Sequence, residues 1–145
     1  MNINEIKKHL YNDSLESAKK YITSVKDEET LYVYTNNYNW DNGFDIPISI
    51  INNPSCSLSV ALLIFHLADG ITYLNTKSTN DNLPEWSAFI ETLYNKIISN
   101  TYKPGTVSFT PELNKVQLMK LRKSLSSTDQ IFITEIIGSD CNILL

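Results

Sequence analysis

One segment constrains the fold of this chain more than any other, and it reads LSVALLIFHLA over residues 58–68. Apolar side chains occupy nearly every face of a helix drawn through it, and such a helix belongs at the centre of a fold. Ser57 precedes it as an N-cap, and Gly70 follows as a C-terminal stop. Its longest unbroken apolar run, residues 60–65, is far shorter than the roughly 20 residues of a membrane span. The segment therefore predicts the central helix of a protein that does not enter a membrane.

Amphipathic helices are predicted on both sides of this segment. Before it, residues suited to N-capping precede apolar residues at helical spacing: Asn2, Asp13, Asp27 and Asp45. After it, the pattern predicts a helix over about 84–102, another opened by Thr110 and Pro111, and a last one capped by Ser127. The run IFITEII at 131–137 is rich in β-branched residues, so a strand is the alternative there.

These elements predict an all-α fold in a single domain over residues 1–145. We expect seven or eight short helices packed as antiparallel hairpins, because the links between them are short. The hairpins would form an orthogonal bundle or an α-solenoid-like array. A short strand pair is the alternative at the C-terminus.

Charge and composition exclude several classes of function. Lys and Arg number 12 against 16 Asp and Glu, whereas a nucleic-acid-binding protein normally has a basic face. One local group of cations is interpreted as the solvated side of a helix: Lys115, Lys120, Arg122 and Lys123. The N-terminus lacks the apolar core of a signal peptide, so we expect a cytoplasmic protein. A net charge of −4 fits solubility or a basic partner.

Metal-binding spacing is missing from the cysteines and histidines. Cys56 and Cys141 lie far apart, and neither His9 nor His66 stands at a ligand spacing from them. We therefore expect buried, reduced thiols, with no metal and no cofactor. His9 stands among lysines and is expected to be exposed.

The most unusual stretch is NYNWDNGFDIP, residues 37–47. Asn37, Asn39 and Asp41 alternate as calcium ligands do, but positions six and twelve hold Asn42 and Ile48 where an EF-hand needs Gly and Glu. The calcium interpretation is therefore excluded. Most of the stretch has a structural explanation, with a turn at Gly43, a helix N-cap at Asp45, Pro47 in the first helical turn, and anchoring by Trp40 and Phe44. Asp41 has no structural role in this account.

His66 lies three residues before Asp69, a spacing that lets a carboxylate meet the imidazole on one helix face. No nucleophile motif accompanies them, since Ser59 lacks the G-x-S-x-G frame. We interpret His66 as a hydrogen-bonded structural residue. The catalytic alternative is a hydrolase that uses Asp41, Asp45 and His66 in a cleft beside the central helix.

The stretch NWDNGFDIP, the following INNPSCSLSVALLIFHLADG and the spaced apolar residues after Trp86 together resemble a known family. It is a family of small bacterial proteins with a domain of unknown function, in which a Trp-Asp-(Asp/Asn)-Gly-Phe motif and a proline precede a hydrophobic helix. The resemblance runs from about Tyr38 to Tyr102. It carries over six motif positions: Asn39, Trp40, Asp41, Gly43, Phe44 and Pro47.

Such families are similar to small helical proteins encoded beside bacterial toxins, where immunity proteins bind and block a partner. The resemblance therefore implies a non-catalytic, immunity-like protein-binding module that neutralises a toxin. Asn39, Trp40 and Asp41 are the candidate binding residues, and a basic toxin is the expected kind of partner. No nucleic acid and no membrane are expected among its partners.

Overall fold

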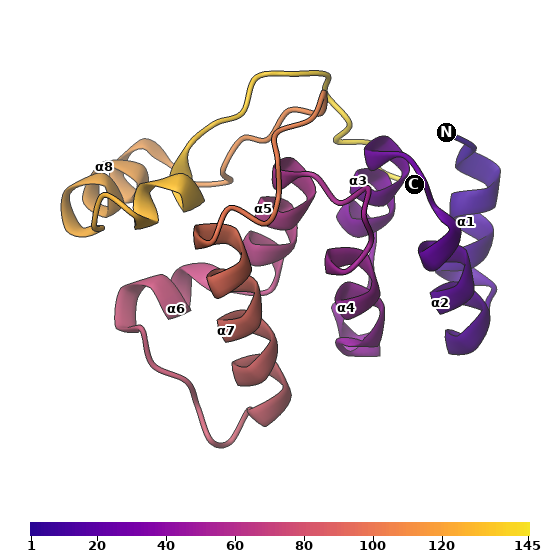
Figure 1. Ribbon diagram of the computed structural model, residues 1–145, viewed down its shortest axis with the longest axis horizontal. Coiled ribbons are helices and arrows are strands. Elements are labelled where there is room, and N and C mark those ends of the chain that lie inside the picture. The colour runs from indigo at the N-terminus through magenta and orange to yellow at the C-terminus, as the bar shows by residue number, and fades with distance from the viewer.

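A computed structural model describes all 145 residues, and it consists of helices and the loops that connect them (Figure 1). The all-α prediction is confirmed, since eight α-helices and two short 3₁₀ helices form and no strand does. The elements in chain order are α1 (Ile3–Tyr11), α2 (Leu15–Ser24), α3 (Glu28–Asn36), η1 (Trp40–Asn42), α4 (Asp45–Ile51), α5 (Leu58–Leu67), α6 (Gly70–Thr76), α7 (Pro84–Ile98), α8 (Lys115–Ser124) and η2 (Asp129–Ile133).

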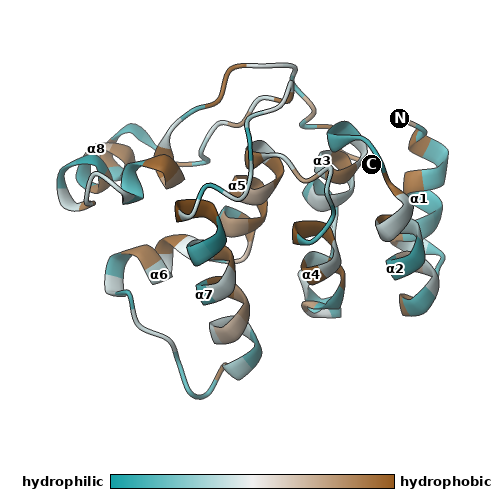
Figure 2. Cartoon of the chain, in the orientation of Figure 1, coloured by the Kyte–Doolittle hydropathy of each residue, from teal (hydrophilic) through white to brown (hydrophobic).

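The apolar segment is the central helix, as predicted. Every residue of α5 from Leu58 to Phe65 is buried, and α5 packs against α3, α4, α6 and α7. Figure 2 shows it as a hydrophobic helix in the middle of the molecule. Burying a Leu, Ile or Phe side chain contributes about 1.5–3 kcal/mol, so this one helix supplies a large part of the hydrophobic stabilisation.

The N-terminal helices stand side by side to the right of α5 in Figure 1. Helix α2 packs on α4, and α1 packs on α2 and α3. Asn53, which is buried just after α4, donates from its Nδ2 to the carbonyls of Ile22 (2.8 Å) and Val25 (3.0 Å) at the end of α2. The amide therefore links α4 to α2. It satisfies the Val25 carbonyl and gives a second bond to the Ile22 carbonyl, which already accepts from the Val25 N–H (3.2 Å).

A buried carboxylate, Asp129, links the C-terminal region to α6 and α7. Asp129, whose side chain is 3% exposed, forms an ion pair with Lys77 and accepts a hydrogen bond from the Tyr94 hydroxyl (2.6 Å). Lys77 is the C-cap of α6, Tyr94 lies on α7 and Asp129 begins η2. This triad holds the C-terminal region against α6 and α7.

Several predicted helix starts are confirmed by their capping bonds. Asn2, Asp27 and Ser57 accept from the backbone N–H three residues ahead, at 3.1, 2.9 and 3.4 Å. The predicted cap Asp13 is wrong by one residue, because Ser14 accepts from Ser17 N and α2 begins at Leu15. Asp13 is instead occupied by a contact to His9.

Three other predicted helix limits are wrong. Gly70 begins α6 and does not end α5; the left-handed residue at that corner is Asp69, with φ 61° and ψ 39°. A side chain at position 70 would clash, because a Cβ there would lie 2.3 Å from the Phe65 ring. Helix α7 ends at Ile98, several residues before Tyr102. Helix α8 begins at Lys115, because Asn114 and Gln117 form a reciprocal capping box.

The segment 131–137 forms neither the predicted helix nor a strand. Its first residues complete η2, and Ile136 then meets Phe109 in an isolated antiparallel bridge. A second isolated bridge joins Val107 to Ser139. The packing of the helices as antiparallel hairpins in a bundle or solenoid stays a prediction.

No single helix is long and apolar enough to cross a membrane. Helices α5 and α6 reach the required length and apolarity only when taken together, and they meet at a bend of 81°.

Candidate functional site

The unusual stretch forms a tight corner between α3 and α4. Asn39 caps η1 by accepting from the Asp41 N–H at 3.0 Å. Gly43 then turns the chain with φ 89° and ψ −165°, and its carbonyl accepts from the Tyr38 hydroxyl at 2.7 Å. The conformation of Gly43 belongs to a region that essentially only glycine adopts. The corner therefore depends on a glycine at this position.

Aromatic rings hold this corner against α7. Tyr38 meets Trp40 edge-on with centroids 5.4 Å apart, and Trp40 meets Phe44 at 6.1 Å. Phe44 continues the series to Phe89 of α7, at 5.0 Å. Such pairs add about 0.5–1.5 kcal/mol each beyond their buried area. The Trp40 Nε1 is buried and has no hydrogen-bond partner.

Helix α4 starts immediately after the corner. Its N-cap is Phe44, one residue earlier than the predicted cap Asp45, and no side chain caps the helix. Asp45 is its first residue, where a carboxylate interacts favourably with the helix dipole. Pro47 is buried in the first turn. Asp41, on η1, is exposed and its side chain makes no hydrogen bond within the chain.

A groove of about 610 Å³ opens between this corner, α4 and α7. We name it the motif groove, and its lining comprises Asn42, Gly43, Phe44, Asp45, Ile48, Ile51, Asn52, Glu85, Ala88, Phe89 and Thr92. Asp45 and Glu85 are the only charged residues in this lining, and both are acidic. Ile48 leaves 43% of its surface exposed there. The groove thus offers an apolar floor flanked by two carboxylates.

His66 does not reach the motif groove. Its Nε2 lies 2.6 Å from the Phe132 carbonyl, which can only accept, so this nitrogen carries the proton. Burial lowers the pKa of His66 and keeps the imidazole neutral. The ring lines a separate cavity of about 310 Å³ that shares no residue with the motif groove. Asp45 and His66 are therefore not brought together.

The predicted pairing of His66 with Asp69 does not form either. The Asp69 carboxylate accepts from the Thr72 hydroxyl at 2.9 Å, because Asp69 lies beyond the end of α5 in a left-handed conformation. The interpretation of His66 as a hydrogen-bonded residue is confirmed by its bond to Phe132.

The structure pairs His9 with Asp13, which the sequence prediction missed. The His9 Nδ1 lies 2.5 Å from the Asp13 carboxylate, and the imidazole stacks on Tyr21 with centroids 4.0 Å apart. The predicted exposure of His9 is wrong, since its side chain is 12% exposed. The hydrogen bond from His9 lowers the pKa of Asp13. Their spacing of four residues was the available signal.

The structure contains no group of three or more His, Cys, Asp or Glu side chains that could hold a metal ion. The two cysteines are free and buried, as expected.

Comparison with known families places the corner and its groove in context. A family described as "Domain of unknown function (DUF4274)" matches residues 26–98, which is half of the chain. The chain belongs to the DUF4274 family. No curated protein and no solved structure matches it.

The DUF4274 match begins just before α3 and ends with α7. All residues that line the motif groove lie inside it, from Asn42 to Thr92. The His9–Asp13 pair and α8 lie outside it. The groove is therefore made entirely from the part of the chain that the family shares.

Proposed function

We propose that this DUF4274 protein is a non-catalytic bacterial protein-binding module of the cytoplasm, immunity-like in role, that neutralises a basic toxin. The binding site in this proposal is the motif groove. Its partner presents an apolar side chain flanked by Lys or Arg.

The observation that carries this proposal is the combination of charge and exposure in the groove. Asp45 and Glu85, on α4 and α7, are the charged residues of the lining, while the Lys96 Nζ places one cation at its Asn52 end, where it donates to the Asn52 side chain (2.7 Å). The half-exposed Ile48 lies with Phe44 and Phe89 in the same lining, so the groove offers an apolar surface that an inserted side chain would cover. Carboxylates around such a surface favour cationic partners and speed their encounter.

The candidate binding residues immediately precede the first lining residue of the groove in the sequence: Asn39, Trp40 and Asp41. They lead directly into the lining residue Asn42, within or next to η1. The exposed Asp41 adds a third carboxylate to this end of the site. In the proposed complex Asp41 contacts a cation of the partner, while Trp40 holds the corner in place.

The test is to identify the partner and then to change the groove. The protein is purified with the product of the neighbouring gene, and a stoichiometric complex with a basic toxin-like protein is expected. Glu85→Lys should weaken that complex roughly tenfold or more, which corresponds to about 1.4 kcal/mol. Glu91→Lys is the matched control, because Glu91 is exposed on the same helix but does not line the groove.

Two results would refute the proposal. One is equal weakening by the two lysine variants, which would place the partner elsewhere. The other is recovery of no partner together with an enzymatic turnover that Asp41→Asn abolishes.

A further inference from the structure

Helix α8 presents an unpaired cationic face. Four of the twelve Lys and Arg residues lie in its ten residues with no Asp or Glu among them, while the rest of the chain holds eight against all sixteen acidic residues. The two ion pairs of the structure, His9–Asp13 and Lys77–Asp129, involve none of them. The charge of α8 is thus opposite to that of the remaining molecule.

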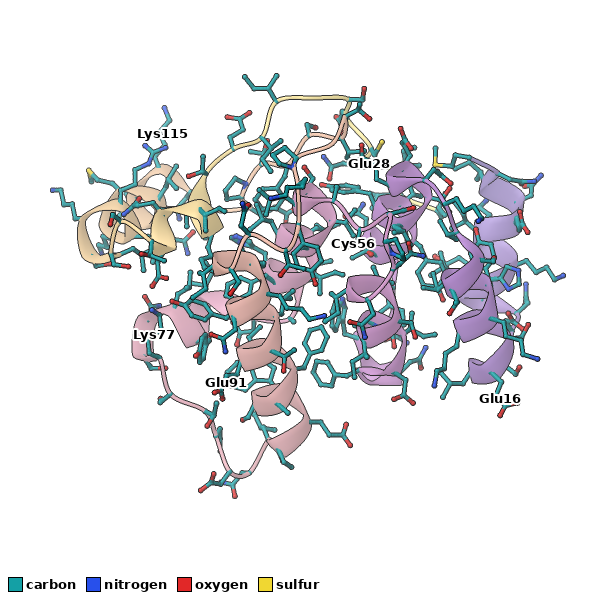
Figure 3. All side chains as sticks on the ribbon, viewed as in Figure 1. Glu16, Glu28, Cys56, Lys77, Glu91 and Lys115 are labelled. Carbon is teal, nitrogen blue, oxygen red and sulfur yellow. The ribbon has the colours of Figure 1, made fainter.

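Apolar side chains lie in the middle of this cationic face. Met119 and Val116 are 51% and 54% exposed. Residues three and four apart are neighbours on a helix, so Met119 is adjacent to Lys115, Val116, Arg122 and Lys123. We name these five residues the α8 face. Figure 3 shows Lys115 directed away from the body of the molecule. Leu121 is the one buried residue of α8.

The α8 face has the chemistry that the motif groove is suited to bind. The groove combines Asp45 and Glu85 with the exposed Ile48, and the face combines three cations with Met119 and Val116. Methionine adapts readily to an irregular apolar surface. Both surfaces occur on one chain, so their charge complementarity does not depend on an unknown molecule.

A chain cannot place its own α8 in its own groove. Helix α8 packs mainly on η2, and Figure 1 shows it at the end of the molecule, with α5 and α7 between it and α4. Contact between the two surfaces therefore requires two copies. Because the surfaces differ, the contact is head-to-tail and either closes into a ring or continues as a chain.

We infer that a second copy of this chain inserts its α8 face into the motif groove when no other partner is present. The inference rests on the proposed use of that groove as a binding site, and it adds a competitor that the true partner must displace. A contact between two small, exposed and oppositely charged surfaces is weak, and added salt weakens it further.

Sedimentation of the full chain tests the inference without any other protein. The average mass should rise with concentration at low salt and return to that of the monomer at high salt. Glu85→Lys, and separately the double variant Lys115→Glu with Arg122→Glu, should each weaken association roughly tenfold or more. Glu91→Lys and the double variant Lys19→Glu with Lys20→Glu change the net charge equally at exposed sites outside both surfaces and should leave it unchanged.

Mixing the two disabled variants gives the sharpest result. The groove of the Glu85→Lys variant carries a lysine and fits the acidic α8 of the Lys115→Glu, Arg122→Glu variant. The unchanged α8 of the first variant also fits the unchanged groove of the second, so association should return. A variant that had merely unfolded would not regain it.

Three outcomes overturn the inference: a monomer at every concentration, association that both variants retain, or no recovery on mixing. A chain that stays monomeric while its α8 binds phosphatidylglycerol vesicles also overturns it, because the occupant is then a lipid surface. Since this experiment contains no toxin, the inference can fail while partner binding at Glu85 stands.

Discussion

Replacing Gly43 by alanine should destabilise the protein through its backbone alone. A Cβ at this position meets no atom within 4 Å, so the substitution introduces no steric clash. The backbone angles, φ 89° and ψ −165°, lie in a region essentially confined to glycine, where another residue costs about 1–3 kcal/mol. For a chain of this length, each kcal/mol lowers the melting temperature by about 2–4 °C. Thermal and urea unfolding followed by circular dichroism would measure both quantities.

Asparagine provides the critical comparison, because it tolerates the left-handed helical region far better than alanine does. Gly43→Asn should be as destabilising as Gly43→Ala, since the ψ of Gly43 lies outside that region. Asp69→Asn should stay within about 0.5 kcal/mol of the parent, because Asp69 does lie in it, with φ 61° and ψ 39°. If Gly43→Asn were as stable as the parent protein, the argument from backbone conformation would be refuted.

Further substitutions test three buried polar groups: Asp129, Asn53 and His66. Lys77→Met should cost about 1–3 kcal/mol in urea unfolding, because Asp129 keeps its buried charge but loses its cation; a cost near zero would contradict this. Asn53→Ala should cost about 1–3 kcal/mol in the same assay, since the Val25 carbonyl loses its donor and the Ile22 carbonyl keeps only the Val25 N–H. Asn53→Asp removes the same donor, so stability equal to that of the parent protein would contradict this argument. Burial lowers the pKa of His66 below its ordinary 6.5, so the unfolded chain takes up the proton first and stability should fall as the pH drops below 6.5. His66→Gln should flatten that dependence, and an unchanged slope would show that another group is responsible.

Helix positions were largely predictable because they depend on local chemistry. The caps at Asn2, Asp27 and Ser57 follow from short side-chain oxygens that accept backbone N–H groups nearby. Helix ends were less predictable where two local signals compete. The sequence predicts that Gly70 ends α5, but the ring of Phe65 occupies the space beside it and Asp69 makes the left-handed turn.

The candidate site was predictable only in part. The sequence stretch 37–47 and its glycine indicated a structured corner, and Asp45 and Phe44 do line the motif groove. Glu85, Phe89 and Thr92 could not be connected to that corner, because they lie on α7, some forty residues further along the chain. Likewise, no local pattern showed that His66 would donate to the Phe132 carbonyl or that Asp69 would accept from Thr72 instead of meeting His66.

The sequence by itself determined the all-α class and the central place of α5, because periodicity and apolar content act within one helix. It also determined the cationic composition of α8. Only the tertiary structure decided which side chains from distant helices meet: the motif groove, the burial of His9 and the Lys77–Tyr94–Asp129 triad. Those contacts depend on how helices pack across the core, and packing is a property of the whole chain that no short segment encodes.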